Sequence, residues 1–265
     1  MDTIKIITLS VIQGITELLP ISSTGHLILA GNLLDYDISG NTLFLSVLHL
    51  GTTLAIILFF RKELFKNFFT RSKWLFFLKL LLASIPVAVV GFLFEGYITE
   101  LLHKDIVIAI SLISIGILFI IIENIKIKAE IVAPENIPLS KMLLIGLGQT
   151  LALIPGTSRS GITTLTGMWC GMDKYSAFNF SFILGIPILL GSTIYEIVKA
   201  YLNISDRSIL TGSLSIVKMI PTILVTFLIG YLALHIVKKF QKKKWLTVFG
   251  IYRILIGILI LVLAI

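Results

Sequence analysis

Long runs of apolar residues, separated by short polar stretches, make up most of this chain. Six runs are uninterrupted and approach the roughly 20 residues that a helix needs to span a bilayer. They lie near residues 43–60, 74–94, 105–123, 177–198, 216–237 and 246–265. The pattern predicts an all-α integral membrane protein, built as a polytopic helix bundle.

Two further apolar regions, 4–34 and 141–171, are interrupted midway by polar residues. The interruptions read "PISSTGH" from Pro20 and "PGTSRSG" from Pro155. Backbone that leaves a helix at membrane depth is tolerated only where it is buried in protein or lines a wet cavity. Both regions are therefore predicted to be re-entrant helix hairpins.

Basic residues gather in two segments between the apolar runs. Residues 61–73 hold five basic residues and one acid, and residues 238–244 hold five basic residues. Such clusters mark cytoplasmic loops. Counting spans from these loops, 141–171 enters from the cytoplasm and 4–34 enters from the outer face, which predicts an inverted repeat.

A match between the halves supports this weakly. At an offset of 135 residues the paired positions are Pro20 with Pro155, Ser22 with Thr157, Ser23 with Ser158 and Ser46 with Ser181. Inverted repeats with interrupted helices place binding sites near the bilayer midplane. We expect one membrane domain over 1–265, with repeat 1 at about 1–125 and repeat 2 at about 138–265; chance similarity between apolar segments is the alternative.

Composition narrows the class further. The 265 residues are 57% hydrophobic and 14% charged, against about half and a quarter in soluble domains. The net charge of +8 comes from clusters between spans, so we expect no nucleic-acid partner. The single cysteine, Cys170, excludes an internal disulfide framework and a multi-cysteine metal site.

The second interruption places Arg159 between two hydroxyls. An arginine at membrane depth costs roughly 2.5 kcal/mol or more and usually faces an interior site. A guanidinium matches phosphate oxygens bidentately, and a helix start with free N–H groups favours anions. "TSRSG" therefore indicates a phosphate cradle; an arginine that snorkels to the interface is the alternative.

The first interruption carries a carboxylate, hydroxyls and an imidazole. Glu17 follows Gln13 by one helical turn, so their side chains share a face if the segment is helical. Ser22, Ser23 and Thr24 could simply cap the next helix, or one could act as a nucleophile. His26 can move protons near neutral pH, and a buried Glu17 needs a partner or an ion.

Arginine, serine, histidine and carboxylate together suit phosphoryl transfer from a lipid-anchored substrate. A flippase or transporter for polyprenyl phosphate could use the same anion cradle without cleaving anything. His49 and Ser46 in "LSVLHLG" are less specific and could line the cavity.

"QGITELLPISSTGH" and "PGTSRSGITT" resemble the two signature segments of the undecaprenyl-diphosphatase (BacA/UppP) family. The likeness extends through "LHLGTTLA" and "FSFILGIP" over nearly the whole chain. Gln13 is allowed by the family's (E/Q)xxxE element, whereas His49 stands where glutamine is expected. Position 49 is therefore a departure from the family's pattern.

This resemblance implies hydrolysis of a polyprenyl diphosphate to the monophosphate and phosphate, carrier-lipid recycling for cell-wall synthesis, and bacitracin resistance. It implies a multi-pass protein of the plasma membrane, in contact with membrane lipids, with a site opening to the outer face and a divalent cation, Mg²⁺ or Ca²⁺. A homodimer is compatible with the sequence.

Carried over by position, the catalytic residues would be Glu17, Ser23, His26 and Arg159. The substrate-binding residues would be Gln13, Ser22, Thr24, Gly156, Thr157, Ser158, Ser160 and Thr163. On this assignment Arg159 clamps the diphosphate, and Ser23 attacks phosphorus with His26 as base or acid. Glu17 orients His26 or binds the metal; a metal-activated water is the rival nucleophile.

Overall fold

The long helices coincide with the predicted spans. The computed structural model describes residues 3–38, 40–102, 104–125, 129–130, 133–202, 216–240 and 244–263, and among these it contains helices and no strand. Six helices are long and apolar enough to cross a membrane. They are α3 (Thr42–Phe59), α5 (Arg71–Leu93), α7 (Asp105–Asn124), α10 (Lys174–Leu202), α12 (Ile216–Phe240) and α13 (Trp245–Leu263). The predicted all-α, multi-pass membrane fold is confirmed. Of the basic segment 238–244, residues 241–243 lie outside the described residues.

Both interrupted regions form pairs of short helices around a break. The first pair is α1 (Thr3–Thr16) and α2 (Ser23–Leu33). The second pair is α8 (Leu139–Gln149) and α9 (Arg159–Trp169), with the 3₁₀ turn η2 (Thr150–Leu153) between them. The breaks begin before the prolines, because α1 ends ahead of Glu17. Re-entry into a membrane stays a prediction.

Three short elements complete the described chain. Helix α4 (Arg61–Phe65) follows α3, α6 (Glu95–Leu102) follows α5, and the 3₁₀ turn η1 (Pro134–Asn136) precedes α8. Helix α4 lies in the basic segment, and α6 lies at the opposite end of α5 from it.

A serine with an unusual backbone conformation starts the second helix of each pair. Ser22 and Ser158 both have φ of 71°, a left-handed value that a side chain makes costly. The Oγ of Ser22 accepts from the Gly25 N–H, and the Oγ of Ser158 accepts from the Gly161 N–H. Ser22 therefore corresponds to Ser158, so the predicted pairing of Ser22 with Thr157 is off by one residue.

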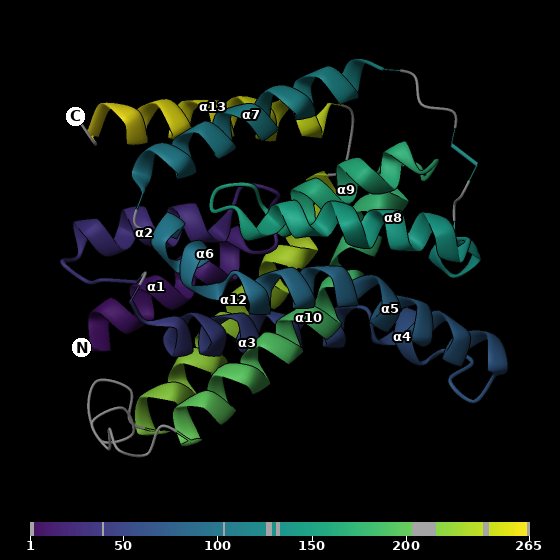
Figure 1. Cartoon of the computed structure of the whole chain (residues 1–265), viewed down its shortest axis with the longest axis horizontal. Coiled ribbons are helices and arrows are strands. Elements are labelled where there is room, and N and C mark those ends of the chain that lie inside the picture. The colour runs from purple at the N-terminus through teal and green to yellow at the C-terminus, as the bar shows by residue number, and fades with distance from the viewer. Residues whose placement is uncertain are drawn as a thin grey trace.

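Helices of the first half of the chain pack against helices of the second half. Helix α1 packs against α12, whereas α8 packs against α5; α3 packs against α10, and α7 against α13. Figure 1 shows α7 and α13 side by side along one edge. A Cβ on Gly116 would lie 2.7 Å from the Gly250 carbonyl oxygen, and one on Gly250 would lie 2.6 Å from the Gly116 carbonyl oxygen. These reciprocal contacts are typical of a two-fold relation between the halves, whose inverted orientation in a membrane stays a prediction.

The side chains on the outside of the bundle suit a lipid environment. Large apolar residues on the long helices are about half exposed, as illustrated by Leu78, Ile117, Leu228 and Leu255. Polar residues with little exposure gather inside, at the two breaks. The fold thus puts its chemistry at the centre and hydrocarbon at the surface.

Candidate active site

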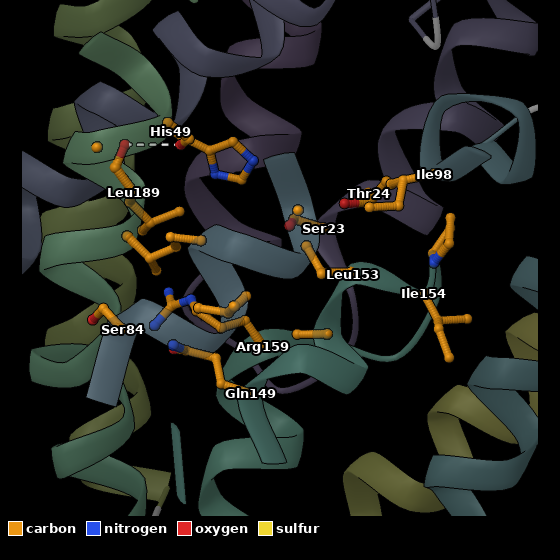
Figure 2. A pocket seen from close by; sticks show the side chains of 18 of the residues that line it. Ser23, Thr24, His49, Ser84, Ile98, Gln149, Leu153, Ile154, Arg159 and Leu189 are labelled. Atoms are coloured by element: carbon orange, nitrogen blue, oxygen red, sulfur yellow. Dashed lines mark hydrogen bonds between the residues drawn. The ribbon is translucent and has the colours of Figure 1, made fainter. Parts of the chain in front are cut away.

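One pocket of about 690 Å³ joins the two breaks. Its walls come from α3, α5, α6 and α10 as well as from both breaks. Among the residues of the breaks and of α3 that border it are Glu17, Ser22, Ser23, Thr24, His49, Gly156, Ser158, Arg159 and Ser160. Figure 2 shows Ser23, Thr24, His49 and Arg159 around this space. The expected meeting of the two polar segments is therefore present.

Glu17 is the centre of the polar contacts. Its Oε1 accepts a hydrogen bond of 2.9 Å from Arg159 Nη2, and its Oε2 accepts one of 2.6 Å from Ser23 Oγ. Glu17 and Ser23 are each 7% exposed. A carboxylate buried to this extent needs a charged partner, and the guanidinium provides it. The Ser23 hydroxyl therefore donates to a carboxylate that also forms an ion pair with Arg159.

Gln13 and His49 lie next to the carboxylate oxygen that Ser23 contacts, Oε2. Gln13 Nε2 lies 3.3 Å from Glu17 Oε2 and 3.0 Å from His49 Nδ1. The amide nitrogen is a donor, so this orientation places a donor next to an anion, and the ring nitrogen facing it accepts. His49, where the sequence departs from the family pattern, thus takes part in the contacts around Glu17.

Arg159 is fixed by the first turn of α9 and by α10. Its Nη1 donates to the Ser181 carbonyl oxygen at 2.8 Å. Gly185, one turn further along α10, makes room for the guanidinium, since a Cβ there would overlap its atoms. The side chain is therefore directed toward Glu17 by contacts from the second half of the chain.

His26 lies apart from these groups, contrary to the expectation. Its Nδ1 is 2.8 Å from the Ser22 carbonyl oxygen, which can only accept, so this nitrogen carries the proton. Its Nε2 is 2.8 Å from the Tyr252 hydroxyl, and the two rings stack. In this structure both ring nitrogens of His26 contact groups other than Ser23 and Glu17, so the expected pairing of His26 with these two residues is not present, and a catalytic role for His26 stays a prediction.

Three other predicted residues support the pocket from behind and do not border it. Gln13 contacts Glu17 as described, and Thr163 Oγ1 donates to the Arg159 carbonyl oxygen at 2.7 Å within α9. Thr157 contributes its carbonyl oxygen to a contact with Arg253. Their assignment as substrate-binding side chains does not match these positions.

Arg253 is a residue that the sequence reasoning missed. It is fully buried in α13 and donates to the carbonyl oxygens of Pro20 at 3.0 Å, Gly156 at 2.7 Å and Thr157 at 3.0 Å. One guanidinium therefore ties the two breaks together. The available signal was an arginine inside the apolar run 246–265, where such a residue usually has a role.

Away from the polar groups, the pocket is apolar and ends in a polar rim. Ile85, Phe92 and Ile188 are among its apolar lining residues. At the rim, Lys199 forms an ion pair with Glu95. The pocket thus combines an anion site with space for a hydrocarbon chain.

Comparison with known proteins agrees with this geometry. A protein of Enterococcus faecalis named undecaprenyl-diphosphatase is 33% identical over 274 residues, covering 99% of this chain and 97% of that protein. A protein of the same name from Methanococcus aeolicus is 35% identical over 264 residues, covering 98% of each chain. Residues 6–259 match the family described as bacitracin resistance protein BacA. The chain therefore belongs to the BacA family.

Proposed function

We propose that this chain is a membrane phosphatase that hydrolyses undecaprenyl diphosphate, or a closely similar polyprenyl diphosphate, to the monophosphate and inorganic phosphate. The names of its relatives support this activity. The observation that carries the proposal is the contact series from Ser23 to Glu17 to Arg159 at the wall of the pocket. In cells, this activity would recycle the carrier lipid for cell-wall synthesis and confer bacitracin resistance.

In the proposed reaction Ser23 is the nucleophile. Its Oγ attacks the terminal phosphorus while its proton passes to Glu17 Oε2, the atom it already contacts. The bond from that phosphorus to the bridging oxygen breaks, and polyprenyl monophosphate leaves. Glu17 passes that proton on to the departing phosphate. Water then attacks the phosphoserine and loses a proton to Glu17, and Glu17 returns this proton to Ser23 Oγ as the bond between Oγ and phosphorus breaks. This releases phosphate and restores the Ser23 hydroxyl. A water that attacks the substrate directly is the rival scheme.

Arg159 would neutralise the phosphate charge that builds up in the transition state. It now shares its charge with Glu17, and a diphosphate entering the pocket competes for the same guanidinium. The N–H groups and hydroxyls at the start of α9, from Ser158 and Ser160, add donors on the same side. The breaks together form the anion cradle.

The apolar part of the pocket would hold the first isoprene units of the lipid. Phe92 on α5 and Ile188 on α10 border it between the polar groups and the rim. A long polyprenyl chain could continue from there into the bilayer. The rest of the tail then needs no protein cavity of its own.

The site would open to the outer face of the plasma membrane. The rim residues Thr42 and Glu95 lie at the ends of α3 and α5 that are opposite the basic segment 61–73. Basic segments remain on the cytoplasmic side, so the rim would face outward. This orientation suits release of a diphosphate lipid on the outer leaflet.

A divalent cation, Mg²⁺ or Ca²⁺, fits the pocket only as a companion of the substrate. Among the described residues, no group of three or more His, Cys, Asp or Glu side chains is arranged to hold a metal. Glu17 offers a carboxylate, and Gln13 Oε1 is buried without a hydrogen-bond partner in the described part of the chain. Mg²⁺ commonly uses few carboxylates and takes phosphate oxygens and water as its other ligands. When bound, the cation would neutralise charge on the diphosphate.

The test is phosphate release from a polyprenyl diphosphate by purified protein, with brief exposure to substrate labelled in the terminal phosphate. We expect a labelled phosphoserine that Ser23→Ala abolishes, with Ser23→Ala and Arg159→Ala each lowering turnover by orders of magnitude. Full turnover by Ser23→Ala would leave water as the nucleophile. Absence of wild-type turnover, with cation present and lipid bound, would favour a carrier in place of a phosphatase.

A further inference from the structure

Gln149 is a buried polar residue at the pocket with no assigned role. It is the last residue of α8, its exposed fraction is 0%, and it borders the pocket. Neither its Nε2 nor its Oε1 has a hydrogen-bond partner among the described residues. Leaving a buried amide unpaired costs free energy, so such groups in native proteins require an explanation.

The surroundings of this amide indicate what would satisfy it. Figure 2 shows the Gln149 side chain directed toward the guanidinium of Arg159. Arg159 Nε is itself buried and without a partner in the described chain. A cation and an amide that both have unused N–H donors and border the same pocket form an unfilled donor set for an oxyanion.

Comparison of the two halves strengthens this reading. Gln13 is the counterpart of Gln149, since each is fully buried in the last turn of the helix before its break. The amide nitrogen of Gln13 is occupied by Glu17 and His49. The same residue type therefore serves the protein in the first half and remains available for a ligand in the second.

We propose that Gln149 is a substrate-binding residue, whose Nε2 donates a hydrogen bond to a phosphate oxygen of the diphosphate next to Arg159. This inference rests on the proposed function in that a diphosphate occupies the pocket. An amide suits the position because it donates without carrying charge, whereas a carboxylate would repel the phosphate.

The experiment compares Gln149→Leu and Gln149→Met with wild type, using hydrolysis kinetics and direct binding of a polyprenyl diphosphate analogue with a methylene bridge. A hydrogen bond to a charged group predicts a rise of about 10- to 100-fold in KM and in the analogue Kd. Thermal stability should stay level or rise, because an apolar side chain removes the unpaired groups. Gln149→Glu should weaken binding further, and increasingly so as the pH rises and the carboxyl group ionises.

Thr150→Val is the matched control. Thr150 is the next residue, does not border the pocket, and donates to the Leu147 carbonyl oxygen. Its variant should keep wild-type KM and Kd.

Wild-type KM and Kd in both the Leu and Met variants would overturn the inference, as would a loss of binding that only follows a loss of thermal stability. If wild type binds the analogue but releases no phosphate from the hydrolysable polyprenyl diphosphate, and Gln149→Leu weakens that binding, the phosphatase proposal fails while this one stands. Failure of wild type to bind the analogue overturns both.

Discussion

Gly185 offers a sharp test of the site because the change is small and lies on a different helix from the residue it affects. In α10 it faces the Arg159 guanidinium, and a Cβ would overlap Nη1 and Cζ and lie 3.0 Å from Nε. The overlap involves two atoms of a planar group, at 1.7 and 2.3 Å, so a small shift cannot relieve it. Gly185→Ala therefore forces Arg159 into another rotamer.

The expected loss follows from the contacts that the present rotamer makes. Arg159 would give up its hydrogen bonds to Glu17 at 2.9 Å and to the Ser181 carbonyl oxygen at 2.8 Å, and its reach toward the phosphate. Two charge-assisted hydrogen bonds to a phosphate at about 1.5–3 kcal/mol each amount to about 3–6 kcal/mol, or roughly 10²- to 10⁴-fold in kcat/KM. Alanine raises helix propensity by about 1 kcal/mol, so the helix itself should not be weakened.

The assay is phosphate release in detergent, together with a thermal unfolding curve for each variant. Gly96→Ala in α6 is the matched glycine control, since Gly96 does not border the pocket and a Cβ there meets no heavy atom of the described chain within 4 Å. Because the added methyl group meets no neighbour, and substitutions at exposed positions usually change stability little, we expect the kcat/KM of this variant to stay within about twofold of wild type. A double variant, Arg159→Ala with Gly185→Ala, should be no worse than Arg159→Ala alone. Wild-type kcat/KM in a folded Gly185→Ala protein would refute the reasoning.

Three further predictions concern the same pocket. Glu17→Gln should lower kcat at least 100-fold, because an amide can neither take the Ser23 proton nor neutralise the charge of Arg159. A kcat within tenfold of wild type in the phosphate-release assay would contradict this. Arg253→Met should lower stability strongly, since three buried carbonyl groups lose a donor at about 1–3 kcal/mol each; an unchanged unfolding midpoint in detergent would show that the breaks do not depend on it. Removing divalent cations with a chelator should abolish turnover, and adding Mg²⁺ or Ca²⁺ should restore it; full turnover in chelator would exclude the cation.

Hydropathy predicted the fold because a membrane helix is specified by its length and apolar content, both of which are local in sequence. The breaks were equally visible, since proline, glycine and hydroxyl residues stand out in an apolar region. Arg159 and Glu17 could be identified as candidates for the same reason: a buried charge is costly wherever it occurs.

The meeting of the two breaks could be predicted, but the individual contacts of those charges could not, because they depend on how distant segments pack. Glu17 meets Arg159 across 142 positions, and the ring of His26 turns to Tyr252 across 226 positions. The second of these contacts depends on α13 lying close to α2, which no local pattern encodes. Gln149 was overlooked because a glutamine at a helix end is unremarkable until its lack of partners is visible.

The hydrogen bonds from Arg253 to both breaks also constrain when, during synthesis of the chain, the pocket can reach its final structure. Helix α13 follows both breaks in the chain, so it leaves the ribosome after every other element of the pocket. Until it is inserted, the carbonyl groups of Pro20 and Gly156 lack their shared donor. The pocket therefore becomes complete only once α13 has been inserted, and a nascent chain halted before α13 would carry the residues of the site without their final arrangement.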